Sequence, residues 1–312
     1  MIQVKNLTKH YGPRRAIHNL NFSIEKGDVV GFLGPNGAGK STTMKIITGF
    51  MAPSSGEASV AGYDVFVNPI EVKKHIGYLP ETPPVYSDMY VREYLQYVAA
   101  LKQVPKSKIE KYVDNAIDKT HLGDVQKRLI GHLSKGFKQR VGIAQAIVSD
   151  PEILILDEPT VGLDPKQVAE IRDLIKELKG QHTIILSTHI LPEVQATCEK
   201  IIIIHHGEIV AQDSIHNLAM MDKGKSRLRI RLRKDAENLH SVLSEINQVI
   251  SVKAGTSAKD WEIDLQGGDE VVDAISSSIV AKGYGLVELS PSKIDLEDVF
   301  LKLTYGEQGG EA

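Results

Sequence analysis

The segment GPNGAGKST, residues 34–42, follows the short apolar run 29–33 and precedes a stretch of helical periodicity that ends at Gly49. It fits the pattern G-x-x-x-x-G-K-[ST] in the strand, loop and helix context where that pattern binds phosphate. Glycines let backbone N–H groups surround an anion, and the start of the following helix adds partial positive charge. The segment therefore predicts a nucleotide phosphate site made of Gly34, Pro35, Asn36, Gly37, Ala38, Gly39, Lys40, Ser41 and Thr42.

Two side chains of this segment and a distant acidic pair predict the chemistry of the site. Lys40 is placed to neutralise the β and γ phosphates of a nucleotide, and the Ser41 hydroxyl is placed to ligate Mg²⁺. The apolar run 153–156 ends in two carboxylates, Asp157 and Glu158. Adjacent side chains on a strand point in opposite directions, so we assign Asp157 to the metal and Glu158 to polarising the attacking water.

Four short apolar runs rich in Val and Ile predict the fold class, because strands buried on both faces read in this way. We expect an α/β fold with a central parallel sheet whose strands are residues 29–33, 153–156, 184–186 and 201–204. A helical insert is predicted between about residues 82 and 149, including a helix from Val91 and another opened by a capping box of Ser107 and Glu110. A further amphipathic helix is expected over residues 167–178.

Composition limits the possible functions. The net charge of −3 argues against a broad nucleic-acid-binding face, since phosphate neutralisation requires a basic excess. The single cysteine, Cys198, excludes an intramolecular disulfide and fits a reducing cytosol. No apolar run reaches the roughly 18 residues of a membrane span, so any link to a membrane is expected to run through a partner.

A second, smaller domain is predicted after a polar linker at residues 221–226. Within residues 227–312, the apolar pattern gives a strand, a helix over 236–246, two strands, a helix over 270–281 and a last strand. This βαββαβ order predicts a small α+β domain of ferredoxin-like type.

Two local patterns each allow a second interpretation. The arginines that alternate with apolar residues over 227–233 could belong to an RNA-binding strand, but a solvated outer face of a sheet is the simpler explanation. The pair His205 and His206 could ligate a metal. Because Gly207 and a further apolar run follow, a hairpin turn explains the pair better.

The sequence LSKGFKQR at residues 133–140, upstream of the acidic pair, resembles the signature of ATP-binding cassette (ABC) proteins, usually L-S-G-G-Q. The resemblance implies that residues 1–220 form a P-loop NTPase domain of the ABC ATPase type. It also implies that Ser134 and Gly136 bind the γ-phosphate held by the opposite subunit, which is anion capture at a helix start. Lys135 and Phe137 depart from the usual signature.

The remaining motifs follow in the family's order. By resemblance, Tyr11 stacks on adenine, Asp164 belongs to a loop that crosses the dimer interface, and His189 contacts the γ-phosphate. The family usually has Gln where this chain has Glu81. A carboxylate can still ligate Mg²⁺, so Glu81 is kept as a metal ligand although it adds negative charge beside the phosphates.

The resemblance implies an ATP-hydrolysing transporter subunit that works as a homodimer beneath a separate integral-membrane permease, on the cytoplasmic face of the cell membrane. The motif Leu296–Phe300 looks like the ending common in ATPases of ABC-2 type exporters, which favours export. Two alternatives fit less well. A P-loop small-molecule kinase would release a phosphorylated product and has no use for the Ser134–Gly136 signature. A soluble ABC ATPase of DNA repair or translation would carry long coiled coils or two tandem cassettes, and neither appears in this sequence.

Overall fold

The computed structural model describes residues 1–219, 225–236, 238–255, 257–267, 269–292, 297 and 300. These divide into two compact units, one ending at Ile215 and one beginning at His216. Of the predicted linker, residues 221–224 lie outside the described residues, and Lys225 and Ser226 begin a strand. Most of the motif at 296–300 also lies outside them.

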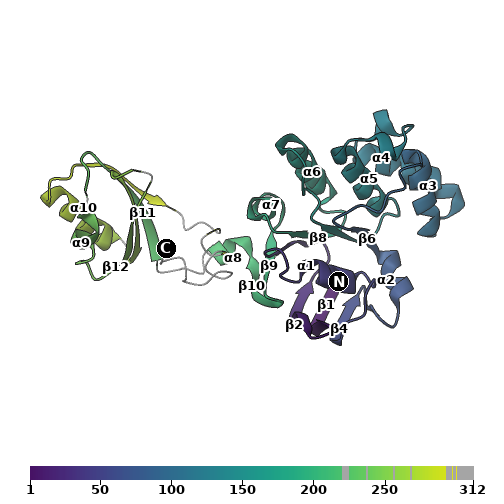
Figure 1. Ribbon diagram of the computed structural model, residues 1–312, viewed down its shortest axis with the longest axis horizontal. Helices are drawn as coiled ribbons and strands as arrows, with labels where there is room; N and C mark the ends of the chain where they lie inside the picture. The colour runs from purple at the N-terminus through teal and green to yellow at the C-terminus, as the bar shows by residue number, and fades with distance from the viewer. Residues whose placement is uncertain are drawn as a thin grey trace. The chain divides into compact units, whose positions relative to one another are not determined.

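The first unit is built on a six-stranded sheet with the strand order β10-β9-β3-β8-β7-β6 (Figure 1). All neighbours are parallel except β10, which pairs antiparallel with β9 at one edge. The strands are β3 (Val29–Leu33), β6 (Ile76–Leu79), β7 (Ile153–Asp157), β8 (Thr183–Thr188), β9 (Lys200–His205) and β10 (Glu208–Ser214). The predicted parallel sheet is confirmed, since each of the four apolar runs lies within one of its buried strands.

A second, antiparallel sheet, which the sequence analysis did not predict, packs against the first. Its order is β2-β1-β4-β5, and its strands are β1 (Ile2–Tyr11), β2 (Arg14–Ile24), β4 (Ser55–Val60) and β5 (Tyr63–Asp64). One apolar core holds the two sheets and helix α1 (Lys40–Ile47) together, with Leu20, Phe32 and Met44 all buried in it. This packing fixes the start of α1, and with it the phosphate-binding segment.

Helices gather beside β6 in the region predicted as a helical insert (Figure 1). These are α3 (Val91–Leu101), α4 (Ile109–Lys119) and α5 (Lys135–Ile147). The other helices of the unit are α2 (Pro69–His75), α6 (Pro165–Leu178), α7 (Leu191–Thr197) and α8 (Ile215–Ala219), and α8 spans the division between the two units.

The predicted capping box is wrong. Ser107 lies in a 3₁₀ turn, and the Glu110 carboxylate instead accepts hydrogen bonds from Arg92 at 3.0 Å and Gln96 at 2.6 Å. In the described ranges, no helix combines the length and apolar character needed to cross a bilayer.

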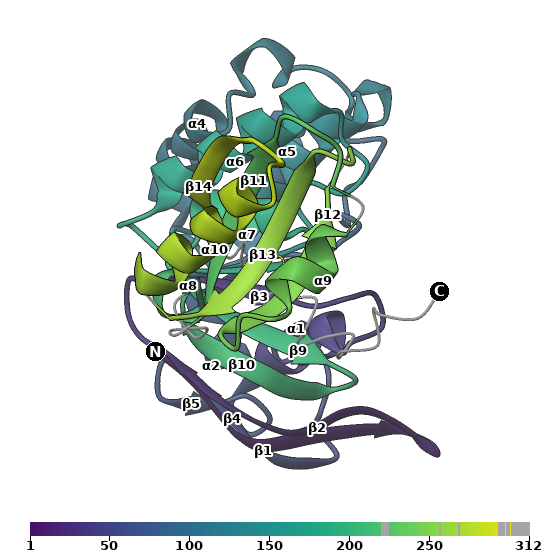
Figure 2. The ribbon, with the colours of Figure 1, turned by 90° about the vertical axis from the view of Figure 1, so that its left-hand side faces the viewer.

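The second unit is a four-stranded antiparallel sheet in the order β12-β13-β11-β14, with both helices on one face (Figure 2). Its elements are β11 (Lys225–Leu232), α9 (Leu239–Leu243), β12 (Val249–Ala254), β13 (Asp260–Gln266), α10 (Asp269–Ala281) and β14 (Leu286–Ser292). The elements follow a βαββαβ order, although α9 is shorter than the helix expected over 236–246. Inward side chains such as Ile230 and Ile263 pack against Leu239 and Ile275 in the core.

The opposite face of this sheet is charged and ion-paired. Arg227 Nε lies 2.7 Å from Asp264 Oδ1, and Arg231 Nε lies 2.9 Å from Asp260 Oδ1. These arginines come from β11 and their partners from β13, so the alternation of arginine and apolar residues in β11 is matched by acidic residues across the strand pair. The face therefore has alternating charge, as expected of a solvated sheet face.

Candidate active site

The phosphate-binding segment joins β3 to α1 and requires glycine at several positions. Gly37 and Gly39 have φ angles of 79° and 110°, a region that glycine enters without steric cost. A Cβ atom on Gly39 would lie 2.6 Å from Ile17 Cγ2, and one on Gly34 would lie 2.3 Å from the backbone oxygen of Ile204. The glycines therefore allow both the curl of the loop and its close contact with the neighbouring strands.

The turn between β9 and β10 braces this segment. The Gly207 N–H donates to the Ala38 carbonyl at 3.0 Å, and the Gly207 carbonyl accepts from the His18 N–H at 2.7 Å. His206 and Gly207 form the turn itself, which confirms the hairpin predicted for the histidine pair. The turn thus links the phosphate-binding segment to β2 through backbone hydrogen bonds.

Lys40 is buried, with its ammonium at the centre of the segment. Its Nζ donates to the carbonyls of Gly34 at 2.8 Å and Pro35 at 3.3 Å, and it lies 3.2 Å from Glu158 Oε1. A phosphate entering the loop would meet this ammonium together with the N–H groups at the start of α1. Phosphate oxygens would therefore compete with Glu158 for the same positive charge.

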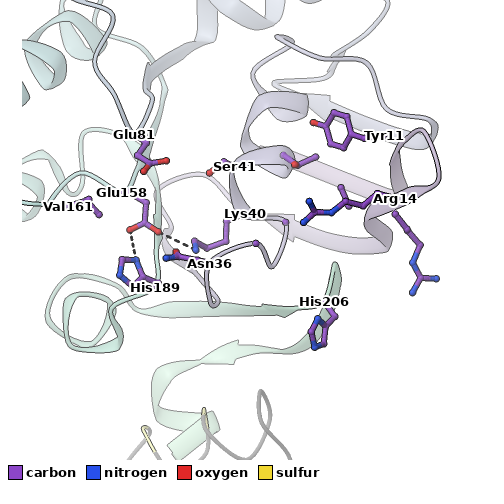
Figure 3. Close-up of a pocket in the computed structure, with 15 residues that line it drawn as sticks. Tyr11, Arg14, Asn36, Lys40, Ser41, Glu81, Glu158, Val161, His189 and His206 are labelled. Atoms are coloured by element: carbon purple, nitrogen blue, oxygen red, sulfur yellow. Dashed lines mark hydrogen bonds and ion pairs between the residues drawn. The ribbon is translucent and has the colours of Figure 1, made fainter.

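Glu158 lies between the lysine and a histidine (Figure 3). Its Oε2 is 2.9 Å from His189 Nδ1, and its side chain is only 6% exposed. Its φ angle is 52°, in the left-handed region that non-glycine residues rarely adopt, while its N–H donates to the Ser187 carbonyl on β8 at 2.8 Å. Such backbone conformations are typical of functional sites. Glu158 is thus held next to both a cation and a potential proton carrier.

The oxygen groups beside the loop fit a magnesium ion bound together with phosphates. The Asp157 carboxylate, at the end of β7, accepts from the Ser187 hydroxyl at 2.7 Å. Burial raises the pKa of Asp157, hydrogen bonds from Ser187 and Ser41 oppose that rise, and the charges of Glu158 and Glu81 add to it. Within the described residues there is no cluster of three or more His, Cys, Asp or Glu side chains that could hold a metal. Mg²⁺ at nucleotide sites needs few protein ligands, since phosphates and water supply the rest.

A pocket of about 670 Å³ brings most of the predicted site residues together. The lining includes Tyr11, Asn36, Gly37, Gly39, Lys40, Ser41, Thr42, Glu81, Glu158 and His189. Tyr11 is 44% exposed and lies across the pocket from Glu158, with its hydroxyl 3.0 Å from the sulfur of Met51 (Figure 3). Gly34, Pro35, Ala38 and Asp157 belong to the loop and strand beside the pocket without being part of its lining.

Sequence reasoning missed five residues that also line the pocket: Arg14, Arg15, Ala16, Val161 and His206. The first three lie in β2 directly after the hairpin that follows Tyr11, so basic residues close to the predicted aromatic were an available signal. His206 comes from the β9–β10 turn, and nothing in the sequence places that turn at this pocket. Of these residues, Arg14 adds positive charge at the end of the pocket away from Glu158 (Figure 3).

Three predicted residues, Ser134, Gly136 and Asp164, do not line this pocket. Ser134 is the N-cap of α5, where its hydroxyl accepts from the Phe137 N–H at 3.4 Å. Asp164 is the N-cap of α6 and accepts from the Gln167 N–H at 2.9 Å. A Cβ on Gly136 would lie 2.7 Å from Gln167 Cδ, so the two helix starts lie next to each other. They form a separate surface of the same unit.

Both departures from the usual signature have defined contacts. The Lys135 ammonium lies against Gly162, in the loop that precedes Asp164. A Cβ atom added to Gly162 would lie 2.0 Å from Lys135 Nζ. The Phe137 ring is 36% exposed and lies 5.9 Å from the Arg140 guanidinium carbon. Lys135 therefore adds a positive charge to the surface that carries Ser134.

Comparison with known proteins gives the family. A family model described as ABC transporter matches residues 17–161. The chain is 33% identical to the bacitracin transport ATP-binding protein BcrA of Bacillus licheniformis, over 98% of this chain and 98% of that protein. The chain belongs to the ABC transporter ATP-binding proteins.

Two further relatives agree with this family. The linearmycin resistance ATP-binding protein LnrL of Bacillus subtilis is 30% identical, over 97% of this chain and 98% of that protein. A solved dimeric ATP-binding cassette in a post-hydrolysis state, bound to ADP and Pi, is 26% identical with a TM-score of 0.63, over 69% of this chain and 99% of that one. This ABC protein is accordingly an ATPase subunit of a transporter that uses ATP and Mg²⁺. The kinase alternative is set aside by this membership.

Proposed function

We propose that two copies of this ABC ATPase bind ATP and Mg²⁺ at a shared interface, and that hydrolysis drives substrate movement, in the direction of export, through a separate membrane permease. The observation that carries the proposal is the separation of the motifs. Ser134, Gly136 and Asp164 lie outside the pocket that holds Lys40 and Glu158. A second copy can supply them to that pocket, and one chain type suffices because it carries both halves.

The residues of the pocket then divide between phosphate binding, Mg²⁺ binding and activation of the attacking water. The loop 34–42 and Lys40 bind the phosphates, while Ser41, Asp157 and Glu81 would hold the Mg²⁺, which shields the phosphate charge when bound. Glu158 accepts a proton from the attacking water, and His189, 2.9 Å from it, contacts the γ-phosphate and keeps that carboxylate oriented. Glu158 would thus face the attacking water at the interface between the two subunits.

A complementation experiment tests the shared site. Lys40→Ala removes the phosphate cation of one subunit, and Ser134→Asp keeps an N-cap oxygen but adds negative charge where the partner's γ-phosphate would lie. Each variant alone should be inactive. Mixing them should restore activity, because one of the two sites in a mixed dimer then has an intact loop and an intact signature. Failure of the mixture to exceed either variant would mean that the site lies within one chain.

The membrane partner is proposed to dock near the Glu81 loop and the helical insert, which would place this subunit on the cytoplasmic face of the membrane. Exposed tyrosines support this location: Tyr86 and Tyr97 are 50% and 42% exposed, and their rings are 5.9 Å apart. Aromatic residues are enriched at protein interfaces. Export is favoured by the names of the relatives, which concern bacitracin transport and linearmycin resistance.

Tyr11 is proposed to stack on adenine, and this predicts a specific loss. Tyr11→Ala should weaken ATP binding about tenfold, since stacking of a base on an aromatic ring contributes about 1–3 kcal/mol. Tyr11→Phe keeps the ring and loses only the hydroxyl contact with Met51, so it should bind within about twofold of the original protein. Fluorescent nucleotide titration measures both. If Tyr11→Ala and Tyr11→Phe weaken ATP binding equally, the Tyr11 ring does not stack on adenine.

The second unit is proposed to stabilise or regulate the dimer. Truncating the chain within residues 220–224 should leave the first unit folded, because the division between units falls before this point. We expect the truncated protein to form the ATP-dependent dimer less readily, by light scattering at equal concentration. If dimerisation, ATPase rate and transport are all unchanged by the truncation, both versions of this role are wrong.

A further inference from the structure

A buried carboxylate that does not line the pocket lies behind the active site. Glu193, in the first turn of α7, is 3% exposed. Its Oε2 accepts from the Thr188 hydroxyl at 3.0 Å, and its Oε1 accepts a short hydrogen bond from the Thr160 hydroxyl. Both threonines are also buried. Burial of a carboxylate is costly unless it is fully hydrogen-bonded, so this arrangement requires an explanation beyond filling space.

The first partner, Thr160, organises the loop that leaves the active site toward Asp164. It lies two residues after Glu158, whose carbonyl accepts from the Val161 N–H at 3.3 Å. The Thr160 carbonyl in turn accepts from the Leu163 N–H at 3.2 Å. Fixing the Thr160 side chain therefore fixes the turn that ends at the N-cap of α6.

The second partner, Thr188, organises the other side of the site. It directly precedes His189, and its hydroxyl oxygen accepts from the Ile190 N–H at 3.1 Å. Its carbonyl accepts from the Gly34 N–H at 3.3 Å, at the start of the phosphate-binding segment. Through the two threonines, the Glu193 carboxylate is thus connected to the loops that carry Glu158 and His189 and to the start of the phosphate-binding segment.

We propose that Glu193 is a positioning residue that couples the His189 loop to the loop 158–164. When the γ-phosphate leaves, a displacement of His189 would also move Thr188. The buried Glu193 carboxylate would transmit that displacement to Thr160, and through the following turn to Asp164. The part of this coupling that crosses to a second copy rests on the proposed shared site. The part that sets Glu158 and His189 relative to each other holds within one chain.

A nearby hydroxyl provides a matched control. Thr197, on the same helix, is buried and donates to Glu193 as well, but to its backbone carbonyl at 2.6 Å. Thr160→Val and Thr197→Val therefore remove the same kind of buried hydroxyl, and only the first takes a donor from the carboxylate. Thr160→Ser keeps that donor.

The test uses the full chain and measures kcat, KM for ATP, the Hill coefficient and the thermal midpoint. We expect Thr160→Val and Glu193→Gln to lower kcat about tenfold with KM within about twofold, since positioning is lost while ATP binding remains. Thr160→Ser and Thr197→Val should keep kcat within about twofold, even where Thr197→Val lowers the thermal midpoint.

Equal kcat for Thr160→Val and Thr197→Val, or a Thr160→Ser variant as slow as Thr160→Val, would overturn the proposal, because both outcomes describe a purely structural hydroxyl. This comparison does not require Glu193→Gln to fold. A Hill coefficient of 1 in the original protein, with no ATP-dependent dimer, would instead contradict the shared site. The kcat contrast between the threonine variants would still decide the role of Glu193.

Discussion

Glu158→Gln is expected to lower the ATP hydrolysis rate at least about 100-fold while ATP binding is retained, because a general base contributes about 10²–10⁴ to a rate. Glutamine has nearly the same shape but cannot take a proton from water. Lys40 keeps its hydrogen bonds to the Gly34 and Pro35 carbonyls in this variant, so the phosphate-binding segment should stay folded. Bound ATP would therefore persist, and the variant should be monomeric without nucleotide and dimeric with it.

Phosphate release and light scattering measure the two effects on the same sample. Glu152→Gln is a matched control, since Glu152 also lies 2.8 Å from a histidine nitrogen, that of His75, but does not line the pocket. It should hydrolyse ATP at the original rate. A Glu158→Gln protein that hydrolyses normally would remove Glu158 from the mechanism, and one that stays monomeric with ATP would contradict the shared site.

Lys40→Ala is expected to weaken ATP binding at least about 100-fold, since a buried ammonium that contacts phosphate forms strong charge-assisted hydrogen bonds. It should also destabilise the protein without nucleotide. The side chains of Lys40 and Glu158 are each 6% exposed, and removing one partner of a buried ion pair costs about 3–5 kcal/mol. Nucleotide titration and denaturant unfolding measure the two losses.

The double variant Lys40→Ala with Glu158→Gln separates these losses. Without the carboxylate, no uncompensated charge remains, so most of the free energy of unfolding should return. ATP binding should not return, because the phosphates still lack their cation. A double variant as unstable as Lys40→Ala would show that the ion pair does not account for the destabilisation.

The sequence predicted the parts of the site that are continuous along the chain. The segment 34–42 lies directly after a buried strand, and Asp157 and Glu158 end another, so local pattern and sheet geometry were enough to place them. The unexpected antiparallel sheet has half-buried strands whose pairing depends on the core shared with α1. The failed capping box shows the same limit, since Glu110 binds Arg92 of another helix rather than its own helix start.

The residues that sequence reasoning missed are joined only by tertiary structure. His206 reaches the pocket on a hairpin turn almost two hundred residues from Tyr11, and Glu193, in α7, accepts a hydrogen bond from Thr160, in the loop after β7. No pattern in the sequence around His206 or Glu193 indicates either contact. Ser134 and Asp164 were recognised from their motifs, and the resemblance assigned Ser134 to a phosphate held by the opposite subunit. In the fold, both residues lie outside the pocket of their own chain.

The hydrogen bond between Gly207 and the Ala38 carbonyl offers an observation point on the phosphate-binding segment that requires no substitution. The Gly207 amide is protected from solvent exchange for as long as that carbonyl stays in place. Its deuterium uptake would therefore rise whenever the segment moves away from the turn, and fall when a nucleotide holds the segment still. One backbone proton would in this way record how often the nucleotide site opens.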